Sequence, residues 1–591
     1  MMSPEIRIRQ LLAFLYGEQG GDHAWHQLQP TLAAFCDQHP ELANGTRQPG
    51  QFLDQRDAIL ITYGDQFREP GRPPLRSLLT FLDTYLGDAV NGVHILPFFP
   101  YSSDDGFSVI DYLVVDPALG TWDDVKAIGS GYKLMFDAVV NHVSRESAWF
   151  QAFLRAEKPF DDYFITADPA QDLSEVVRPR ALPLLTPVET ANGLQHVWTT
   201  FSEDQIDLNF ANVDVLMRVT GVLLAYVAAG ADLIRLDAIA FLWKEVGTTC
   251  LHLPQTHAVV KLWRAVLDLV APNVTLITET NVPHMDNISY FGSVLPEARY
   301  TDEAQMVYNF SLGPVVLHTL RSGDATMLSD WVASQEPPPS GSAFFNFIAS
   351  HDGIGMRPAE NLLTPQEVQA LVDQTVAHRG RVSYRANADG SSSVYELNIT
   401  LYDFLNDPAA AKPELDIARF LASQAILLSL AGVPGIYVHS LFGSRNCEAC
   451  VAETGRARSI NREKFDLASL SQRLDDPSCH EGQVFAGVRR MLALRKTQPA
   501  FHPAAQQRVL SLHRSVFALE RTPLSGGEPL ICLVSTTDQP LKLTVDFATH
   551  GVKAGSVWRD LISEDVLHGA TGESHVSLNP YMVRWLVPSR R

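Results

Sequence analysis

The stretch DLIRLDAIAF at residues 232–241 is apolar except for an aspartate at its start and an arginine and an aspartate two residues apart. Successive side chains of a β-strand point to opposite faces, so Arg235 and Asp237 share one face. Apolar residues recur at helical spacing on both sides of this stretch, at 212–230 and at 256–272. The pattern predicts a buried parallel strand between two crossover helices.

Seven more apolar runs of strand length occur along the chain. Eight parallel strands joined by crossover helices suit a closed barrel, whose strand ends meet at one rim. We therefore predict an α/β protein built on a (β/α)8 TIM barrel, with inserted loop domains and a C-terminal antiparallel β domain. The expected strands span residues 58–67, 92–99, 132–140, 231–238, 274–280, 304–312, 344–352 and 435–443.

The rest of the chain is organised around this barrel. Two connections are too long for simple crossovers; the first holds the proline-rich RPRALPLLTP (178–187) and the second the flexible ANADGSSS (386–393). Short β-rich runs near the C-terminus predict the terminal β domain. The predicted organisation is a helical extension at 1–56, the barrel at 57–143 and 206–504, an inserted domain after strand three at 144–205, an insertion after strand seven at 353–410, and the β domain at 505–591.

The composition argues against two classes of partner. The chain has 591 residues, more than a single hydrophobic core usually organises, and a formal net charge of −21. Nucleic acids and anionic membranes are bound by clustered positive charge, so neither is expected as a partner. The N-terminus lacks the apolar core of a signal peptide, and no run of eighteen uncharged apolar residues occurs, which predicts a cytoplasmic protein.

The six cysteines are scattered over the chain and are not expected to form a disulfide framework, which favours a reducing compartment. Cys447 and Cys450 make one isolated C-x-x-C pair. A zinc site would need a second pair, or histidines at similar spacing, and the sequence offers neither. No metal site is therefore predicted.

Carboxyl groups gather at the predicted ends of the strands, where the active sites of such barrels lie. Asp237 ends strand four, Glu279 ends strand five, and Asp352 ends strand seven beside His351. A single Arg-x-Asp is commonly a buried ion pair, and a single terminal acid is commonly a helix cap. Three such groups on separate strands indicate a catalytic site instead.

Converging carboxylates are what cleavage of a glycosidic bond requires. One attacks the anomeric carbon, a second gives a proton to the leaving oxygen, and a third restrains the sugar. In a retaining mechanism the first two lie about 5 to 5.5 Å apart. Arg235 favours the ionised form of Asp237, whereas the acid must keep its proton near neutral pH, so we expect two pKa values that are pushed apart.

Four short motifs, FDAVVNH, DLIRLDA, ITET and SHDG, stand at the ends of predicted strands three, four, five and seven. They resemble the four conserved regions of the α-amylase superfamily, glycoside hydrolase family 13. Longer stretches, among them GVHILPFFPYSSDDGFSVIDY and VWTTFSEDQIDLNF, resemble the sucrose phosphorylase subfamily and most of all its glucosylglycerate phosphorylases. The resemblance covers residues 57–465. It implies a retaining phosphorylase that converts an α-glucoside, foremost 2-O-α-glucosylglycerate, and phosphate into α-glucose 1-phosphate and the free acceptor.

The resemblance also implies roles for individual residues. Asp237 corresponds to the nucleophile, Glu279 to the general acid/base and Asp352 to the transition-state stabiliser, while Arg235 orients the nucleophile. The substrate-binding positions of the subfamily correspond to Asp104, Phe107, His142, Gln205, Arg235, Phe241, His351 and Arg458.

A phosphorylase must bind phosphate, and charge-assisted hydrogen bonds suit arginine to this task. Arg180 corresponds to the subfamily's phosphate-binding arginine and Tyr395 to its hydroxyl partner, with Arg178 as a further candidate. The resemblance implies no cofactor, since phosphate is a co-substrate. The expected partners are therefore small molecules, an α-glucoside and phosphate, and relatives of this kind are often homodimers.

The sequence departs from sucrose phosphorylase in the acceptor loop, where Ser393 replaces an aspartate and Glu396 replaces a glutamine. Loss of an acid beside the acceptor reduces repulsion of an anion, which is consistent with glycerate. Arg445, after strand eight, is a further candidate for contact with the acceptor.

Several alternatives stay open at this point. Within the subfamily, the acceptor could be glycerol, fructose or fructose 6-phosphate. An α-glucoside hydrolase or transglucosylase would use the same three carboxylates without phosphate. A non-enzymatic relative of the fold would have lost the catalytic groups, whereas all three carboxyl groups are present here.

Overall fold

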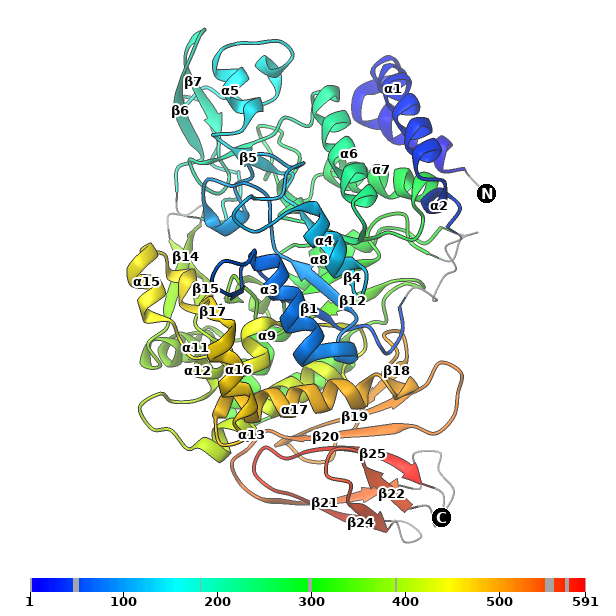
Figure 1. Ribbon diagram of the computed structural model, residues 1–591, viewed down its shortest axis with the longest axis vertical. Coiled ribbons are helices and arrows are strands. Elements are labelled where there is room, and N and C mark those ends of the chain that lie inside the picture. The colour runs from blue at the N-terminus through cyan, green and yellow to red at the C-terminus, as the bar shows by residue number, and fades with distance from the viewer. Residues whose placement is uncertain are drawn as a thin grey trace.

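The computed structural model of the protein describes residues 3–45, 53–180, 182–295, 300–387, 391–547, 557–568 and 573–589 (Figure 1). Residues 388–390, inside the stretch predicted to be flexible, lie outside the described residues, as does Ala181 of the proline-rich stretch.

Eight strands close into a parallel barrel in the order β1-β16-β12-β11-β10-β9-β4-β3. Each corresponds to one predicted strand, so the predicted barrel is confirmed. The barrel strands are β1 (Ile59–Thr62), β3 (Gly92–Ile95), β4 (Lys133–Ala138), β9 (Ala231–Leu236), β10 (Thr275–Thr278), β11 (Met306–Asn309), β12 (Ala343–Asn346) and β16 (Val433–Tyr437). Their residues are almost all buried, because a parallel barrel is covered on the outside by helices and filled inside by side chains.

The predicted strand bounds were too long at the carboxyl ends. Strand seven was expected at 344–352, but β12 stops at Asn346 and the chain continues as an irregular segment to Asp352. Strand eight was expected at 435–443, but residues beyond Tyr437 form the short helix α14 (Val438–Phe442). Buried loop residues at the mouth of a barrel are as apolar as strand residues, so the apolar pattern does not mark where the strands end.

Helices cover the barrel, and the two predicted at 212–230 and 256–272 are α6 and α7. The side chain of Asn212 caps the first turn of α6, and Pro254 occupies the first turn of α7, where its missing N–H costs nothing. The main outer helices are α3 (Pro74–Phe81), α4 (Trp122–Gly129), α6 (Val213–Ala228), α7 (Pro254–Val270), α9 (Leu312–Ser322), α10 (Thr326–Ser334), α13 (Pro413–Ser429) and α17 (His480–Arg495).

Two insertions rise from the carboxyl ends of the strands. The first lies between β4 and α6 and contains a hairpin whose strands pair antiparallel; its elements are β5 (His142–Ser144), α5 (Ala148–Leu154), β6 (Leu185–Thr190), β7 (Gly193–Trp198) and β8 (Gln205–Asp207). The second follows β12 and forms a three-stranded sheet in the order β13-β15-β14. It comprises β13 (Ile354–Gly355), the 3-10 helix η7 (Arg357–Ala359), α11 (Pro365–Ala377), β14 (Arg381–Ala386), β15 (Ser392–Asn398) and α12 (Leu401–Leu405).

The N-terminal helix α1 (Pro4–Gln38) packs along α7 on the outside of the barrel (Figure 1). Ile8 and Leu12 on this helix are fully buried, and Arg7 contacts Asp268 of α7 at 2.6 Å. The contact therefore combines an apolar face with a shielded ion pair, which fixes α1 to the barrel. Among the described residues, no helix has both the length and the apolar character needed to cross a membrane.

The C-terminal β domain, orange and red in Figure 1, lies at the end of the molecule opposite the β6–β7 hairpin. Its larger sheet is antiparallel in the order β18-β19-β20-β25-β22-β23, and β21 pairs with β24 beside it. The strands are β18 (Gln506–Val509), β19 (Val516–Thr522), β20 (Leu530–Ser535), β21 (Leu541–Asp546), β22 (Val557–Asp560), β23 (Val566–His568), β24 (Glu573–Leu578) and β25 (Val583–Ser589).

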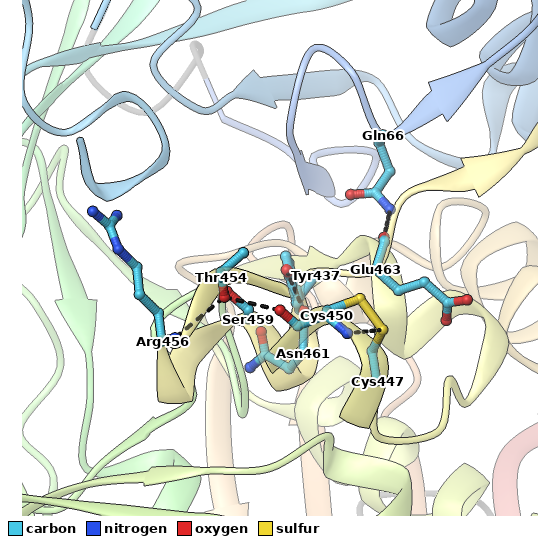
Figure 2. Close-up of a disulfide and its surroundings, with 9 residues drawn as sticks. All are labelled: Gln66, Tyr437, Cys447, Cys450, Thr454, Arg456, Ser459, Asn461 and Glu463. Atoms are coloured by element: carbon cyan, nitrogen blue, oxygen red, sulfur yellow. Dashed lines mark hydrogen bonds between the residues drawn. A yellow bond between two sulfur atoms is a disulfide. The ribbon is translucent and has the colours of Figure 1, made fainter. Parts of the chain in front are cut away.

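Cys447 and Cys450 form a disulfide, which the sequence did not lead us to expect (Figure 2). Cys447 caps the short helix α15 (Glu448–Thr454), so the side chain three positions later lies one turn above it. At the other end of α15, the Thr454 hydroxyl donates to Oγ of Ser459 at 2.7 Å, within the 3-10 helix η8 (Ala457–Asn461). The disulfide therefore closes the first turn of a helix that is bonded to η8.

Candidate active site

A cavity of about 820 Å³, its open mouth included, lies at the carboxyl ends of the barrel strands. The structure brings most of the predicted site residues together around it. Those that line the cavity are Asp104, Phe107, His142, Arg180, Gln205, Asp237, Phe241, Glu279, His351, Asp352, Tyr395, Glu396 and Arg458.

Asp237 follows the last residue of β9, and Arg235 lies two positions earlier on the same face of that strand. Nη1 of Arg235 is 2.7 Å from Oδ1 of Asp237 and also contacts the buried Asp137 of β4. Arg235 does not line the cavity but lies behind Asp237, with only 1% of its surface exposed. Its side chain can therefore orient the Asp237 carboxylate but is not placed to touch a ligand.

Glu279 follows β10, the neighbouring strand, and reaches the same guanidinium group. Its Oε2 atom lies 3.8 Å from Nη2 of Arg235 and accepts a hydrogen bond from the backbone N–H of Ala238 at 2.9 Å. Ala238 has a left-handed backbone with φ of 48°, which turns the chain sharply after Asp237. Asp237 and Glu279 therefore flank one small space at the base of the cavity.

The protonation of these two groups follows from their surroundings. Burial raises the pKa of Glu279 to about 7, with Arg235 opposing and the charges of Asp237 and Asp352 adding to the effect. Burial also raises the pKa of Asp237 from its ordinary value, although Arg235 acts in the other direction. The expected effect of Arg235, which favours the ionised carboxylate, is present but is opposed by burial.

Asp352 lies beyond β12 in the irregular segment, where it faces a cluster of arginines. Its Oδ1 is 2.8 Å from Nη1 of Arg458. Burial alone would raise the pKa of Asp352, but Arg458, His351 and Arg462 hold it well below its usual range. Asp352 is therefore ionised at neutral pH, whereas Glu279 titrates there.

Histidines and aromatic rings form the wall around these carboxylates. The rings of His351 and Phe107 stack with their centroids 4.9 Å apart. His142 Nε2 and Gln205 Nε2 each lie 2.9 Å from the backbone oxygen of Phe107. Burial lowers the pKa of His351 to about 3, so this ring is neutral at pH 7 and acts as a hydrogen-bonding group rather than as a cation. Phe241 meets Phe201 edge to face at 5.5 Å.

The predicted phosphate and acceptor residues are only partly brought together. Arg180 contacts Asp104 at 3.2 Å across the cavity. Glu396 accepts hydrogen bonds from Arg458 at 2.5 and 3.1 Å, so the acid that replaces a glutamine is partly neutralised. Tyr395, beside it on β15, also lines the cavity.

Besides Arg235, three candidates predicted for the phosphate or the acceptor lie outside the cavity lining. Ser393 accepts a hydrogen bond from Nδ2 of Asn387 at 2.8 Å, within the β14–β15 hairpin. Arg445 lies 2.5 Å from Asp403 and is 40% exposed, so its charge is engaged away from the cavity. Arg178 donates to the backbone oxygen of Leu182 and is half-buried outside the cavity lining. The sequence could not show this, because the path of a long loop sets which of its side chains face inward.

Other lining residues were not predicted from the sequence. Asn281 comes two residues after Glu279, and Phe310 follows β11. Arg357 stands in GMRP, just after the SHDG motif. Their positions beyond strand ends were the one available signal, since a lone asparagine or arginine in a loop has no distinctive spacing. No group of three or more metal-binding side chains is found in the described ranges.

Comparisons with known proteins agree with this geometry. The alpha amylase catalytic domain pattern matches residues 82–335. The chain belongs to the α-amylase family. Within that family it is 46% identical to a glucosylglycerate phosphorylase of Allomeiothermus silvanus, over 99% of both chains.

A glucosylglycerate phosphorylase of Escherichia coli is 42% identical over 92% of this chain and 93% of that protein. Among solved structures, the sucrose 6F-phosphate phosphorylase from Thermoanaerobacter thermosaccharolyticum is similar in fold, with a TM-score of 0.70 and 23% identity. The likeness covers 88% of this chain and 98% of that one.

Proposed function

We propose that this protein is a retaining glycoside phosphorylase that transfers the glucosyl group of 2-O-α-glucosylglycerate to phosphate. The products are α-glucose 1-phosphate and free glycerate. The observation that carries the proposal is the placement of Asp237 and Glu279 at opposite nitrogens of the Arg235 guanidinium, both facing the cavity. High identity to glucosylglycerate phosphorylases over almost the whole chain supports the choice of substrate.

In the first step a carboxylate oxygen of Asp237 attacks the anomeric carbon of the bound glucoside. The bond from that carbon to the glycosidic oxygen breaks, and Glu279 gives its proton to this oxygen. A pKa of about 7 allows Glu279 to be protonated in much of the protein at neutral pH. The acceptor leaves with a hydroxyl group, and glucose stays bonded to Asp237.

In the second step an oxygen of hydrogen phosphate attacks the same carbon from the side the acceptor has left. The bond to Asp237 breaks, and the Glu279 carboxylate takes the proton of the incoming phosphate. Two inversions at one carbon give net retention, so the product has the α configuration. Arg180, at the cavity wall, supplies positive charge for the phosphate.

The ionised Asp352 supports both steps through the sugar ring. Positive charge develops at the anomeric carbon in the transition state, and a nearby carboxylate stabilises it. Arg458 pairs with Asp352 and holds it in the ionised form. The stacked rings of Phe107 and His351 provide the flat wall against which a glucose ring can lie.

The test is an assay of product formation. Purified protein is incubated with phosphate and, separately, glucosylglycerate, glucosylglycerol, sucrose and sucrose 6'-phosphate, and glucose 1-phosphate and free glucose are both measured. Glucose 1-phosphate released fastest from glucosylglycerate is the expected result. Free glucose as the main product would indicate a hydrolase. Faster release of glucose 1-phosphate from another glucoside would show that the acceptor is the one in that glucoside and not glycerate.

We further propose that the enzyme works in the cytoplasm. The product is an anionic sugar phosphate, which does not cross a lipid bilayer unaided and is of use to a cell only where it is retained. Cell fractionation followed by the phosphorolysis assay tests this.

A further inference from the structure

Among the described residues, three arginines line the catalytic cavity, and two of them are already paired with carboxylates. Arg180 contacts Asp104 at 3.2 Å, and Arg458 contacts Asp352 at 2.8 Å. The third, Arg357, makes no side-chain hydrogen bond or ion pair with any residue that the structure describes, and its Nε atom is buried without a partner. An arginine in this state is costly unless something else meets its charge.

Two acids act on Arg357 through their charge, Glu360 and Asp286, and neither forms an ion pair with it. Glu360, in the next turn of the chain, is paired with Arg385 at 2.7 Å instead. Burial and the neighbouring Arg385 together lower the pKa of Arg357, which is the sign of an uncompensated positive charge. The charge of Arg357 therefore remains available to a ligand in the cavity.

Arg357 is placed on the side of the cavity where the leaving group must lie. It follows β13, whose Gly355 lies directly against the side chain of Asn281. The approach is so close that a Cβ atom at Gly355 would come within 2.9 Å of the Asn281 amide. Asn281 is only two residues beyond Glu279, so β13 packs directly against the segment that carries the acid/base group. The backbone N–H of Met356 donates to the backbone oxygen of Tyr395 at 2.9 Å. This hydrogen bond places β15, which carries Tyr395, beside the segment that carries Arg357.

We propose that Arg357 binds the carboxylate of the acceptor, and that this contact selects glycerate over neutral acceptors. The inference rests on the proposed phosphorolysis of glucosylglycerate. In 2-O-glucosylglycerate the carboxyl carbon is bonded to the carbon that bears the glycosidic oxygen. The oxygen that Glu279 protonates and the carboxylate are thus close neighbours, and Glu279 and Arg357 both line the cavity that would hold them.

The charge balance of the cavity supports the same assignment. An anionic acceptor must enter a space that already holds five carboxyl groups, those of Asp104, Asp237, Glu279, Asp352 and Glu396. A planar guanidinium group without an internal partner can meet a carboxylate with two parallel hydrogen bonds and offset this repulsion. Neutral glycerol would leave Arg357 unpaired, so the same contact that attracts glycerate disfavours glycerol.

The test compares Arg357→Gln with Arg381→Gln, an arginine of β14 that pairs with Glu448 and does not line the cavity. We expect Arg357→Gln to raise KM for glucosylglycerate roughly 10- to 100-fold, the loss typical of a hydrogen-bonded charge, with KM for phosphate changed less than about 3-fold. The preference for glycerate over glycerol, measured in the reverse direction from glucose 1-phosphate, should fall by a similar factor. Arg357→Lys keeps the charge without the planar fork, so its preference for glycerate should lie between those of Arg357→Gln and the unsubstituted enzyme. Arg381→Gln should not alter the preference.

Three results would overturn the inference. One is an unaltered preference for glycerate in a folded Arg357→Gln protein, and another is an equal rise of KM for phosphate, which would make Arg357 a phosphate ligand. If the unsubstituted enzyme releases glucose 1-phosphate only from a neutral glucoside, the proposed function and this inference fall together. If the unsubstituted enzyme acts on glucosylglycerate and the Arg357→Gln protein keeps the same preference for glycerate, this inference alone is wrong.

Discussion

Oε2 of Glu279 lies 2.9 Å from the backbone nitrogen of Ala238, the residue directly after Asp237. The left-handed turn at Ala238 thus points a main-chain donor at one catalytic carboxyl group while it positions the other. A backbone amide cannot move far or change its charge, so the spacing of the two groups is fixed by the strand ends and not by flexible side chains. Such preorganisation is what a two-step displacement requires.

Removal of Asp237, the proposed nucleophile, should abolish phosphorolysis. Asp237→Asn is expected to lower the rate of glucose 1-phosphate formation by at least about a thousandfold, because the covalent step has no other carboxylate to perform it. The control is Asp232→Asn at the opposite end of the same strand, where the carboxylate accepts a bond from the backbone of Leu134. Residual rates of similar size in both variants would reject Asp237 as nucleophile.

The activity should depend on pH through Glu279. Its pKa of about 7 means that the proton donor is present below pH 7 and is lost above it. We expect kcat/KM for glucosylglycerate to fall about tenfold for each pH unit well above 7. The decline should be absent in Glu279→Gln, whose residual rate lacks this titration, and a flat profile in the unsubstituted enzyme up to pH 9 would contradict the assignment.

The same group should make the protein less stable as the pH rises from about 4.5 to about 7. The folded pKa of Glu279 lies above its value in the unfolded chain, about 4.5, so the stability that its proton provides is complete below pH 4.5 and is lost as the pH rises to about 7. Glu279→Gln, which cannot ionise, should therefore gain on the order of 1 to 3 kcal/mol over the unsubstituted protein between these pH values. Denaturant unfolding of both proteins at pH 5 and pH 8 measures the difference in their free energies of unfolding. The same difference at the two pH values would be evidence against a raised pKa of Glu279.

Arg180 and Arg178 provide a matched pair for the phosphate step. Arg180 lines the cavity, whereas Arg178, two residues earlier, lies outside the lining and is bonded to a backbone oxygen. We expect Arg180→Gln to raise KM for phosphate about tenfold or more, the loss of a charge-assisted hydrogen bond, and to increase the share of free glucose. Arg178→Gln should leave both quantities close to their original values. A larger effect of Arg178→Gln than of Arg180→Gln would place the phosphate site at Arg178 instead.

Reduction of the Cys447–Cys450 disulfide should loosen α15 and η8. A closed loop this short contributes about 2 kcal/mol in the chain-entropy treatment, and the effect is local. Hydrogen exchange of residues 448–461 should become faster after reduction and in Cys447→Ala. Cys447→Ser retains a capping group and should show the smaller change. Identical exchange in the reduced and oxidised forms would show that the helix does not depend on the bond.

The sequence predicted all eight barrel strands because each is a continuous apolar run, as strands buried on both faces must be. It also predicted Asp237 and Glu279, since a charged residue directly after such a run falls at the rim of the barrel. Asp352 was predicted for the right rim but on a strand that ends six residues earlier. In each case the local pattern carried the information.

The differences between the predicted site residues and the observed cavity lining concern contacts between distant segments. Ser393 and Arg445 were expected at the acceptor and lie outside the cavity lining, while Arg357 lines it and was not predicted. Which loop side chain faces inward depends on how β13, β14 and β15 pair, and no periodicity in the sequence specifies that. The burial that raises the pKa of Asp237 against the effect of Arg235 was not predicted for a related reason, because the degree of burial emerges only when the surrounding elements assemble.

The position of α1 bears on how the protein can be produced. This helix covers the outer wall of α7, with Ile8 and Leu12 turned fully inward. A shortened chain that starts at β1 would present the apolar wall of α7 to solvent and would be prone to aggregate during expression. Fusion partners are therefore better joined ahead of α1 than in place of it.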